Sequence, residues 1–106
     1  MEEGKVFDTN ILMKFKMGME GKTTIINIVE YPKALGYNLE ILIPDLEDYN
    51  KAIKIMDLLL KIGKPIPAAD TIIAAMCINR HLKLATKDKH FKSVASVDNE
   101  FELELV

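Results

Sequence analysis

The sequence has one cysteine, Cys77, one arginine, Arg80, and no tryptophan among its 106 residues. A single cysteine excludes a scaffold held together by internal disulfides, and Cys77 is expected to be a small core residue. No apolar run approaches the roughly 18 residues that a membrane-spanning helix requires. The first residues, Met1 to Lys5, are acidic, whereas a secretory signal begins basic and continues apolar. We therefore expect a soluble, cytoplasmic protein that does not use a membrane.

Positive charge is not in excess either. Fourteen basic residues face sixteen acidic ones, which gives a net charge of −2. This balance disfavours a protein that holds nucleic acid by general neutralisation of phosphates. One arginine also limits bidentate recognition of bases or phosphates. If the chain binds a polyanion, a bound metal ion is one candidate for what attracts it.

The remaining composition is that of an ordinary globular domain. Hydrophobic residues make up 49% and charged residues 28%, a mixture that excludes intrinsic disorder. A chain of this length is expected to form one domain, residues 1–106, and to bury roughly 65% of the surface that it exposes when unfolded.

Apolar runs and alternating patterns predict five strands and four helices. The strands are expected over 5–8, 23–26, 39–43, 82–86 and 101–106, and the helices over 9–15, 27–36, 46–62 and 68–80. Asn27 is expected to cap the second helix, with Glu30 at capping-box spacing, although Pro32 interrupts that helix. Asp45 is expected to cap the long helix over 46–62.

Strands that alternate with helices predict a parallel α/β sheet. Acidic residues alternate with apolar ones in the third and fifth strands, and this marks them as sheet edges. The strand order 3-2-1-4-5 satisfies this pattern and predicts an α/β/α sandwich. Its switch point lies between the first and fourth strands, which Asp8 and Asp88 follow.

Four acidic residues adjoin apolar runs at strand ends or helix starts: Asp8, Glu30, Asp70 and Asp88. All these ends lie on one rim of a parallel sheet, where four carboxylates repel one another unless a cation neutralises them. Oxygen ligands without neighbouring cysteines select Mg²⁺ or Mn²⁺ over Zn²⁺. Taken singly, Glu30, Asp70 and Asp88 have structural explanations as a capping-box acid, a helix-start charge and a turn residue. Asp8 is the least easily explained, because a buried strand seldom ends in an unpaired acid.

Four segments together resemble the PIN domain family, of the type found in VapC toxins. VFDTNIL (6–12) looks like the opening of such a domain. IINIVE (25–30), IPAADTIIAA (66–75) and LATKDKHF (84–91) resemble the second, third and fourth acidic motifs. The correspondence runs from Lys5 to the final strand.

The resemblance implies a Mg²⁺- or Mn²⁺-dependent endoribonuclease, usually a toxin that a cognate antitoxin neutralises, and often a homodimer. By position, the catalytic carboxylates and metal ligands would be Asp8, Glu30, Asp70 and Asp88. Supporting hydrogen bonds would come from Thr9, Asn10 and Thr86. Apart from the resemblance, Lys87, Lys89 and His90 are candidates for RNA contacts, and a solvated turn is the alternative interpretation of this segment. Metal-activated water would attack the phosphodiester in line, without a covalent enzyme intermediate.

Two departures from the family leave an alternative open. Residues 13–22 and 31–43 are shorter than the corresponding family segments, and His90 stands where the family often has Asp or Asn. A degenerate PIN domain that serves as a binding or scaffold module is therefore the alternative. A receiver-like phosphoacceptor domain fits less well, because it needs paired acids after the first strand.

The helix predicted over 46–62 carries two apolar rows, a wider arc than one core face requires. One row is Leu46, Tyr49, Ile53, Met56 and Leu60, and the other is Ala52, Ile55, Leu59 and Ile62. A helix wedged deep in its own domain and a helix that offers a partner surface are equally open. The second possibility predicts a homodimer.

Overall fold

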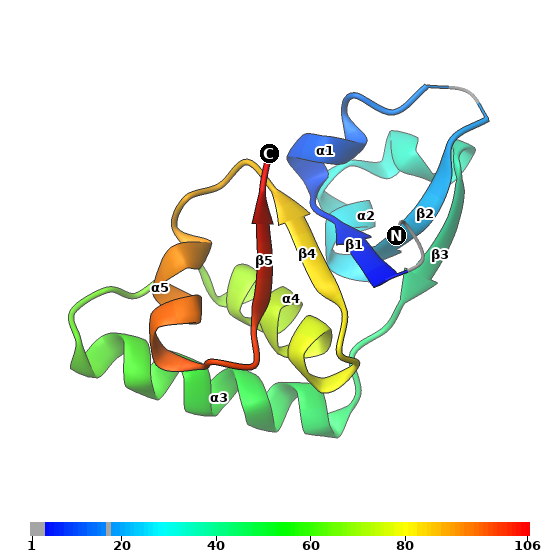
Figure 1. The fold of residues 1–106 in the computed structure, drawn as a ribbon. Helices are drawn as coiled ribbons and strands as arrows, with labels where there is room; N and C mark the ends of the chain where they lie inside the picture. Colours follow the sequence, from blue (N-terminus) through cyan, green and yellow to red (C-terminus); the bar gives the residue numbers. More distant parts are fainter. Residues whose placement is uncertain (1–3, 17) are drawn as a thin grey trace.

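A five-stranded parallel sheet forms the centre of the computed structural model, which describes residues 4–16 and 18–106 (Figure 1). Its strands are β1 (Lys5–Phe7), β2 (Glu20–Thr24), β3 (Asn38–Leu42), β4 (Lys83–Thr86) and β5 (Glu102–Leu105). The order is β3-β2-β1-β4-β5, and every pairing is parallel. The predicted α/β/α fold, the strand order and the edge positions of the third and fifth strands are confirmed.

Helices cover both faces of the sheet. They are α1 (Thr9–Leu12), α2 (Ile25–Glu30), the 3₁₀ helix η2 (Pro32–Gly36), α3 (Leu46–Lys61), α4 (Ala68–Asn79) and α5 (Phe91–Val97). Successive strand residues point to opposite faces, and β1 shows the division. Val6 packs into a core with α3, α4 and α5, whereas Phe7 packs into a second core with α1, α2 and η2.

The core on the Val6 side is mostly aliphatic, contains Phe91 and Phe101 as well, and is built around α4. Residues 73–78 of that helix are all buried, which explains why its sequence is apolar on nearly every side. The long helix α3 packs against α4 and contributes Ala52, Ile55 and Leu59. Of the two predicted rows on α3, the one with these residues is therefore the core row, although its last member, Ile62, is exposed.

The core on the Phe7 side is smaller and partly aromatic. Phe7 and Phe15 meet edge to face, with ring centroids 5.2 Å apart. A Cβ at Gly21 would lie only 2.6 Å from the Phe7 ring, so β2 needs glycine at this position. The short helices α1 and α2 complete this core with Leu12 and Ile28.

The boundary between β2 and α2 was predicted wrongly. The strand ends at Thr24 and the helix begins at Ile25, two residues earlier than the pattern of apolar residues indicated. Thr24, not Asn27, is the N-cap, because its hydroxyl accepts a hydrogen bond from the Asn27 backbone N–H. The expected Asn27–Glu30 capping box is therefore wrong, and the helix ends at Glu30 just before Pro32 starts the separate helix η2.

The predictions for the other helices were partly right. The long helix capped by Asp45 is confirmed, and Asp45 and Asp48 form a reciprocal capping box there. The first helix is only four residues long, and α5 was not predicted at all. No side chain caps α5 in the described structure, so the sequence carries no start signal for it, and Phe91 and Val94 anchor it in the core instead.

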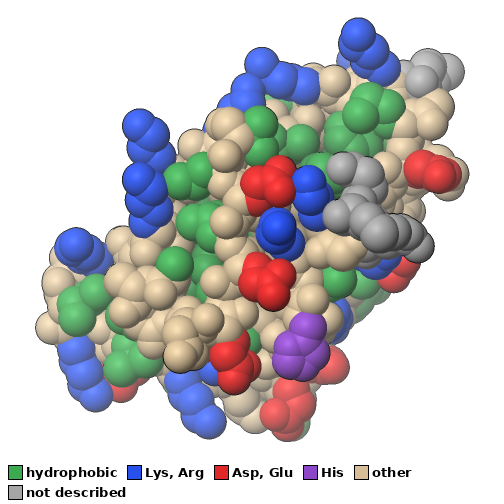
Figure 2. Space-filling view, viewed as in Figure 1, with side chains coloured by type: hydrophobic (Ala, Val, Ile, Leu, Met, Phe, Trp, Pro, Cys, Tyr) green, Lys and Arg blue, Asp and Glu red, His purple; other side chains and the backbone are tan. Residues whose placement is uncertain are grey.

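The face of β4 and β5 that points away from α4 is charged. Figure 2 shows acidic and basic side chains next to one another across the middle of the molecule in this view. Lys83 pairs in register with Glu102, and Lys5 of β1 forms an ion pair with Glu104 at 3.0 Å. Alternation in β5 thus reflects one apolar face and one charged face. None of the described helices is long and apolar enough to span a membrane.

Candidate active site

A cavity of about 400 Å³ lies at the carboxyl ends of β1 and β4, where the sequence predicts the switch point of the sheet. Its lining comes from α1 and the residues that flank it, from α2 and α4, and from the segment after β4: Asp8, Thr9, Asn10, Met13, Glu30, Asp70 and Asp88. All four acids singled out in the sequence are among them. Residues separated by up to 80 positions in the chain therefore line one cavity.

Asp8 is the fixed point of this cavity. Its side chain is buried, with 3% of the residue exposed, and the carboxylate accepts hydrogen bonds on both oxygens. Oδ1 accepts from the Thr9 backbone N–H at 2.9 Å, and Oδ2 accepts from the Thr86 hydroxyl at 2.7 Å and the Asn10 amide at 3.5 Å. Such donors offset the cost of burying a charge. The site therefore holds one carboxylate in a single orientation.

Asn27 is the residue of this site that sequence reasoning placed in the wrong role. It is fully buried, and its Nδ2 donates to Asp8 Oδ1 at 2.8 Å and to Thr9 Oγ1 at 3.0 Å. Its Oδ1 accepts from the Thr24 hydroxyl at 2.6 Å. A buried amide three residues before Glu30, inside an apolar helix, was the available signal, because an Asn within a helix needs a partner for its amide.

Glu30 reaches the cavity from the end of α2. It is an exposed residue, and its Oε1 accepts a hydrogen bond of 2.6 Å from the Thr9 hydroxyl. Thr9 Oγ1 in turn accepts from Asn27 Nδ2, so a continuous chain of hydrogen bonds joins Glu30 to Asp8. This chain links the two carboxylates through Thr9 and Asn27.

Asp70 enters the cavity from the first turn of α4 and is poorly compensated. Burial raises the pKa of the Asp70 carboxyl, the nearby carboxylates of Asp8 and Glu30 raise it further, and His90 acts in the opposite direction. His90 Nε2 lies 2.9 Å from Asp70 Oδ2, and the Asp70 side chain is 14% exposed. The ionised form of Asp70 is therefore disfavoured in the folded chain.

The segment after β4 supplies Asp88 and the predicted RNA contacts. The Thr86 hydroxyl accepts from the Asp88 backbone N–H at 3.0 Å, and Asn10 Oδ1 accepts from the Lys87 backbone N–H at 3.0 Å. Asp88, Lys87 and Lys89 are exposed, and His90 is half-buried against Asp70. The three residues predicted to support the acids, Thr9, Asn10 and Thr86, all take part in these hydrogen bonds.

Two lysines adjoin the rim. The amine of Lys14 lies close enough to that of Lys87 to lower the pKa of Lys87. Like charges are brought together here in a chain whose net charge is negative. An anion at this point would relieve their repulsion.

Cation binding can be tested against these side chains. The lining supplies only oxygen donors and one nearby imidazole, which suits a hard divalent cation. Among residues 4–16 and 18–106, no three His, Cys, Asp or Glu side chains converge closely enough to form a ligand shell as they stand. The donor chemistry therefore fits Mg²⁺ or Mn²⁺, and the carboxylates would have to move closer together to form the ligand shell.

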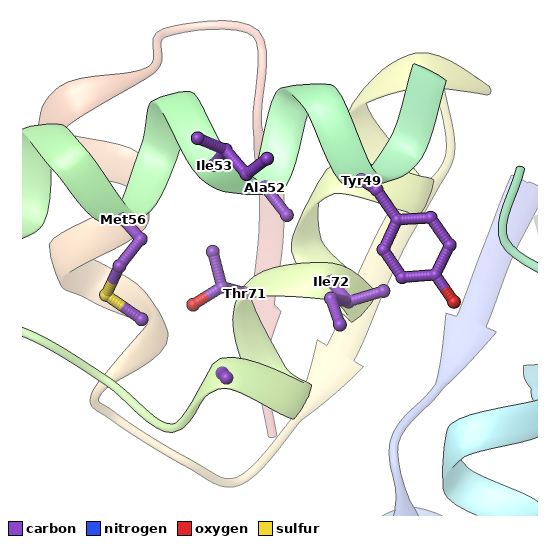
Figure 3. A pocket seen from close by; sticks show the side chains of 7 residues that line it. Tyr49, Ala52, Ile53, Met56, Thr71 and Ile72 are labelled. Carbon is purple, nitrogen blue, oxygen red and sulfur yellow. The ribbon is translucent and has the colours of Figure 1, made fainter. Parts of the chain in front are cut away.

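A second, apolar cavity of about 210 Å³ lies between α3 and α4 (Figure 3). It is lined by Tyr49, Ala52, Ile53, Met56, Ala68, Thr71 and Ile72. Beside it, α3 exposes apolar side chains of the other predicted row, among them Leu46, Tyr49, Ile53 and Leu60. This row is not wedged into the core of its own chain.

Comparisons with known proteins agree with this architecture. A sequence profile described as the PIN domain matches residues 19–97. No curated protein sequence matches the chain.

Several solved structures share the fold. One is VapBC2 from Rickettsia felis, solved bound to a DNA fragment from their promoter, with a TM-score of 0.75 and 17% identity over 95% of this chain and 97% of that chain. Another is VapBC-1 from nontypeable Haemophilus influenzae, with a TM-score of 0.74 and 17% identity over 95% and 96% of the two chains. VapBC-5 from Mycobacterium tuberculosis, a member of the VapBC family of toxin-antitoxin systems, gives a TM-score of 0.71 and 19% identity over 98% of each chain. At these identities the likeness establishes a common fold.

Proposed function

The chain belongs to the PIN domain family, and we propose that it is a metal-dependent endoribonuclease acting as the toxin of a toxin–antitoxin pair. One observation carries this proposal: Asp8, Glu30, Asp70 and Asp88 line a single cavity at the carboxyl ends of the central strands. The described lining holds no cationic side chain, and His90 beside it contacts Asp70. Structural ion pairs elsewhere in the chain, such as Asp48–Arg80, do have one. Acids gathered without such a partner favour a cation-binding role.

The four carboxylates would hold Mg²⁺ or Mn²⁺. Such an ion, when bound, polarises a phosphoryl oxygen and lowers the pKa of a water molecule that it binds. Asp8 would be the immobile ligand, because Thr86 and Asn27 fix both of its oxygens. The 3.5 Å contact from Asn10 is the weakest on Asp8 and leaves Oδ2 the freer oxygen.

The remaining residues of the rim would bind and orient RNA. Lys87 and its neighbour Lys14 form a positive spot that suits a backbone phosphate, and Lys89 extends it along the exposed segment after β4. Water would attack the phosphodiester in line, so the chain needs no nucleophilic side chain of its own. Thr9 and Asn10 would keep Glu30 and the Lys87 backbone in place around the substrate.

We further propose that residues 1–106 form one PIN-like domain with two protein partners. The first is a cognate antitoxin, which is suggested by the VapBC proteins whose fold the chain shares. The second is another copy of this chain, bound through the exposed apolar row of α3 and the adjoining cavity in Figure 3. A lone domain seldom exposes such a stripe.

The homodimer has a direct test. Sedimentation at tens of micromolar suffices to detect a dimer with a Kd of about 1 μM, roughly −8 kcal/mol. Ile53→Glu is expected to give a monomer, because it places a charge in the apolar stripe, whereas Lys54→Glu on the same helix is the matched control and should remain dimeric. A wild-type protein that stays monomeric would contradict this partner.

A non-catalytic binding or scaffold module is the alternative function. The observation that favours it is the small size of the helices beside the cavity, four residues in α1 and six in α2. These helices would have to grip substrate in a nuclease. Retention of all four acids in the cavity favours the enzyme.

Cleavage of single-stranded RNA by the purified protein tests the proposal. We expect cleavage with Mn²⁺ or Mg²⁺, none with chelator, and a fall to that background in Asp8→Asn and Asp70→Asn. Asp57→Asn, an exposed acid paired with Lys61 on α3, is the control and should retain full activity. Activity that survives chelator, or persists in both variants, would rule out the mechanism. RNA binding without cleavage by the wild type would favour the scaffold alternative.

A further inference from the structure

One imidazole nitrogen lies beside the carboxylates without a hydrogen-bond partner among the described residues. His90 Nε2 is shielded from solvent and makes no hydrogen bond within residues 4–16 and 18–106. Buried polar atoms in folded proteins nearly always have a partner, so an exception calls for an explanation. Asp70 Oδ2 lies 2.9 Å from it, at ion-pair distance, in a contact that lacks hydrogen-bond geometry.

The position of this nitrogen is set by the fold. His90 immediately precedes α5, and its ring lies against Phe91 with centroids 4.8 Å apart. Phe91 is itself fully buried, so the imidazole rests on a fixed support. The ring is therefore oriented toward Asp70 by the core of the chain rather than by solvent.

The spacing of the two atoms matches a shared ion. Two ligands at right angles on an octahedral cation, each about 2.1 Å from it, are about 3.0 Å apart. The Asp70 Oδ2–His90 Nε2 separation of 2.9 Å agrees with that value. Two atoms placed for one another by a direct hydrogen bond would instead show a donor aligned with its acceptor.

We propose that His90 supplies a nitrogen ligand, next to Asp70, to the divalent cation of this site, and so shifts its preference from Mg²⁺ toward Mn²⁺. The inference rests on the proposed function, since it requires that the carboxylate cavity bind a cation. Mg²⁺ is bound almost exclusively through oxygen, whereas imidazole is a good ligand for transition-metal ions. Replacing one oxygen ligand with nitrogen therefore weakens the binding of Mg²⁺ relative to the binding of Mn²⁺.

Pulsed electron paramagnetic resonance of the Mn²⁺-loaded protein tests the ligand directly. The wild type should show the ¹⁴N coupling of a bound imidazole. His81→Asn, which removes the other histidine, should keep the signal, and His90→Asn should lose it. His81 is an exposed residue in a left-handed conformation that Asn tolerates, which makes it a matched control.

Binding constants give the second readout. The ratio of the Mg²⁺ to the Mn²⁺ dissociation constant should fall about tenfold in His90→Asn and stay unchanged in His81→Asn, within the range seen when groups around metal sites are removed. Mn²⁺ bound to the wild type without ¹⁴N coupling would overturn the role of His90 and leave the carboxylate site standing. No cation bound by the wild type would overturn both.

Discussion

Asp48 and Asp70 occupy the same position in two helices and have opposite surroundings. Each is the third residue of its helix, Asp48 in α3 and Asp70 in α4. Burial disfavours the charge of Asp48, yet hydrogen bonds from the Asp45 backbone, Asn79 and Arg80 outweigh burial and lower the pKa of Asp48. For Asp70, burial and the neighbouring carboxylates dominate, and its pKa is raised.

The residue before each helix accounts for much of this difference. Asp45 offers a backbone N–H to Asp48 Oδ2 at 2.9 Å and completes a reciprocal capping box. At the corresponding position before α4 stands Pro67, which has no N–H to donate. Asp70 is thereby released from a capping role and can face the cavity. The same sequence position thus becomes structural in one helix and available for ligand binding in the other.

The comparison also concerns the cationic partner. Asp48, 1% exposed, has the only arginine of the chain, with Nη1 2.9 Å from Oδ1. Asp70 has a histidine at 2.9 Å and two further carboxylates nearby. A buried acid that is permanently paired contributes to stability, whereas an acid without permanent compensation stores repulsion that a ligand can relieve.

Removing the partner of Asp48 should have the largest effect on stability. Arg80→Met leaves a buried carboxylate without its cation, and it also removes the bond from Nη2 to the Ile43 carbonyl. We expect the free energy of unfolding to fall by about 3 kcal/mol, near the lower limit for broken buried pairs because Asn79 still donates to Asp48. Chemical denaturation measures it.

The control for this prediction is an exposed pair. Lys61→Met breaks the contact with Asp57, in which both side chains are mostly exposed. We expect the free energy of unfolding to fall by less than about 0.5 kcal/mol. Equal losses in the two variants would mean that the burial of Asp48 does not distinguish it.

Acidification should reduce the contribution of Asp48 to the free energy of unfolding. Because its folded pKa lies below the unfolded value of about 3.9, the carboxylate contributes its full stability above that pH. The contribution is lost as the pH falls through the folded pKa. The difference in unfolding free energy between wild type and Asp48→Asn should therefore shrink from neutral to acidic pH. A difference that is the same at every pH would show that charge is not what stabilises this site.

Asp70→Asn should have the smallest effect on stability and a different sign. Without metal, removal of a charge that is disfavoured in the folded chain should leave the unfolding free energy unchanged or slightly raised. Neutralising an ordinary acid in the first turn of a helix would instead lower the unfolding free energy by roughly 0.5–1 kcal/mol.

The metal response completes the test. Added Mn²⁺ at about 100 times its Kd stabilises the folded chain by roughly 2.7 kcal/mol, because the ion binds only the folded chain. The wild-type melting temperature should therefore rise by roughly 10–20 °C. Asp70→Asn should lose most of that rise, and Asp57→Asn should keep it. Equal shifts in all three proteins would place the ion elsewhere.

Sheet order and the gathering of the acids could be predicted because both follow from local patterns. Alternating charge in β5 and the acid Glu40 in β3 marked the edges, and parallel strands then brought Asp8 and Asp88 to one rim. Neither inference needs knowledge of side-chain packing. Such features are encoded in short stretches of sequence.

The hydrogen bonds within the site could not be predicted in the same way. Asn27 sits three residues before Glu30 and so had the spacing of a cap, but Thr24 competes for that role and prevails. Whether Asn27 then turns to solvent or to Asp8 depends on how α2 lies against β1, a tertiary contact. The surroundings of Asp48 and Asp70 likewise depend on tertiary contacts. Asp48 contacts Arg80, 32 positions away along the chain, and Asp70 contacts His90, 20 positions away.

The single cysteine makes it possible to measure how often α4 detaches from the sheet. Cys77 is fully buried on this helix, and burial raises the pKa of its thiol to about 12, so neither a reagent nor the reactive thiolate is available in the native state. Alkylation therefore proceeds only when α4 detaches from the sheet. Since Asp70 lies on the same helix, the labelling rate of the unmodified chain measures how strongly any occupant of the carboxylate cavity holds that helix in place.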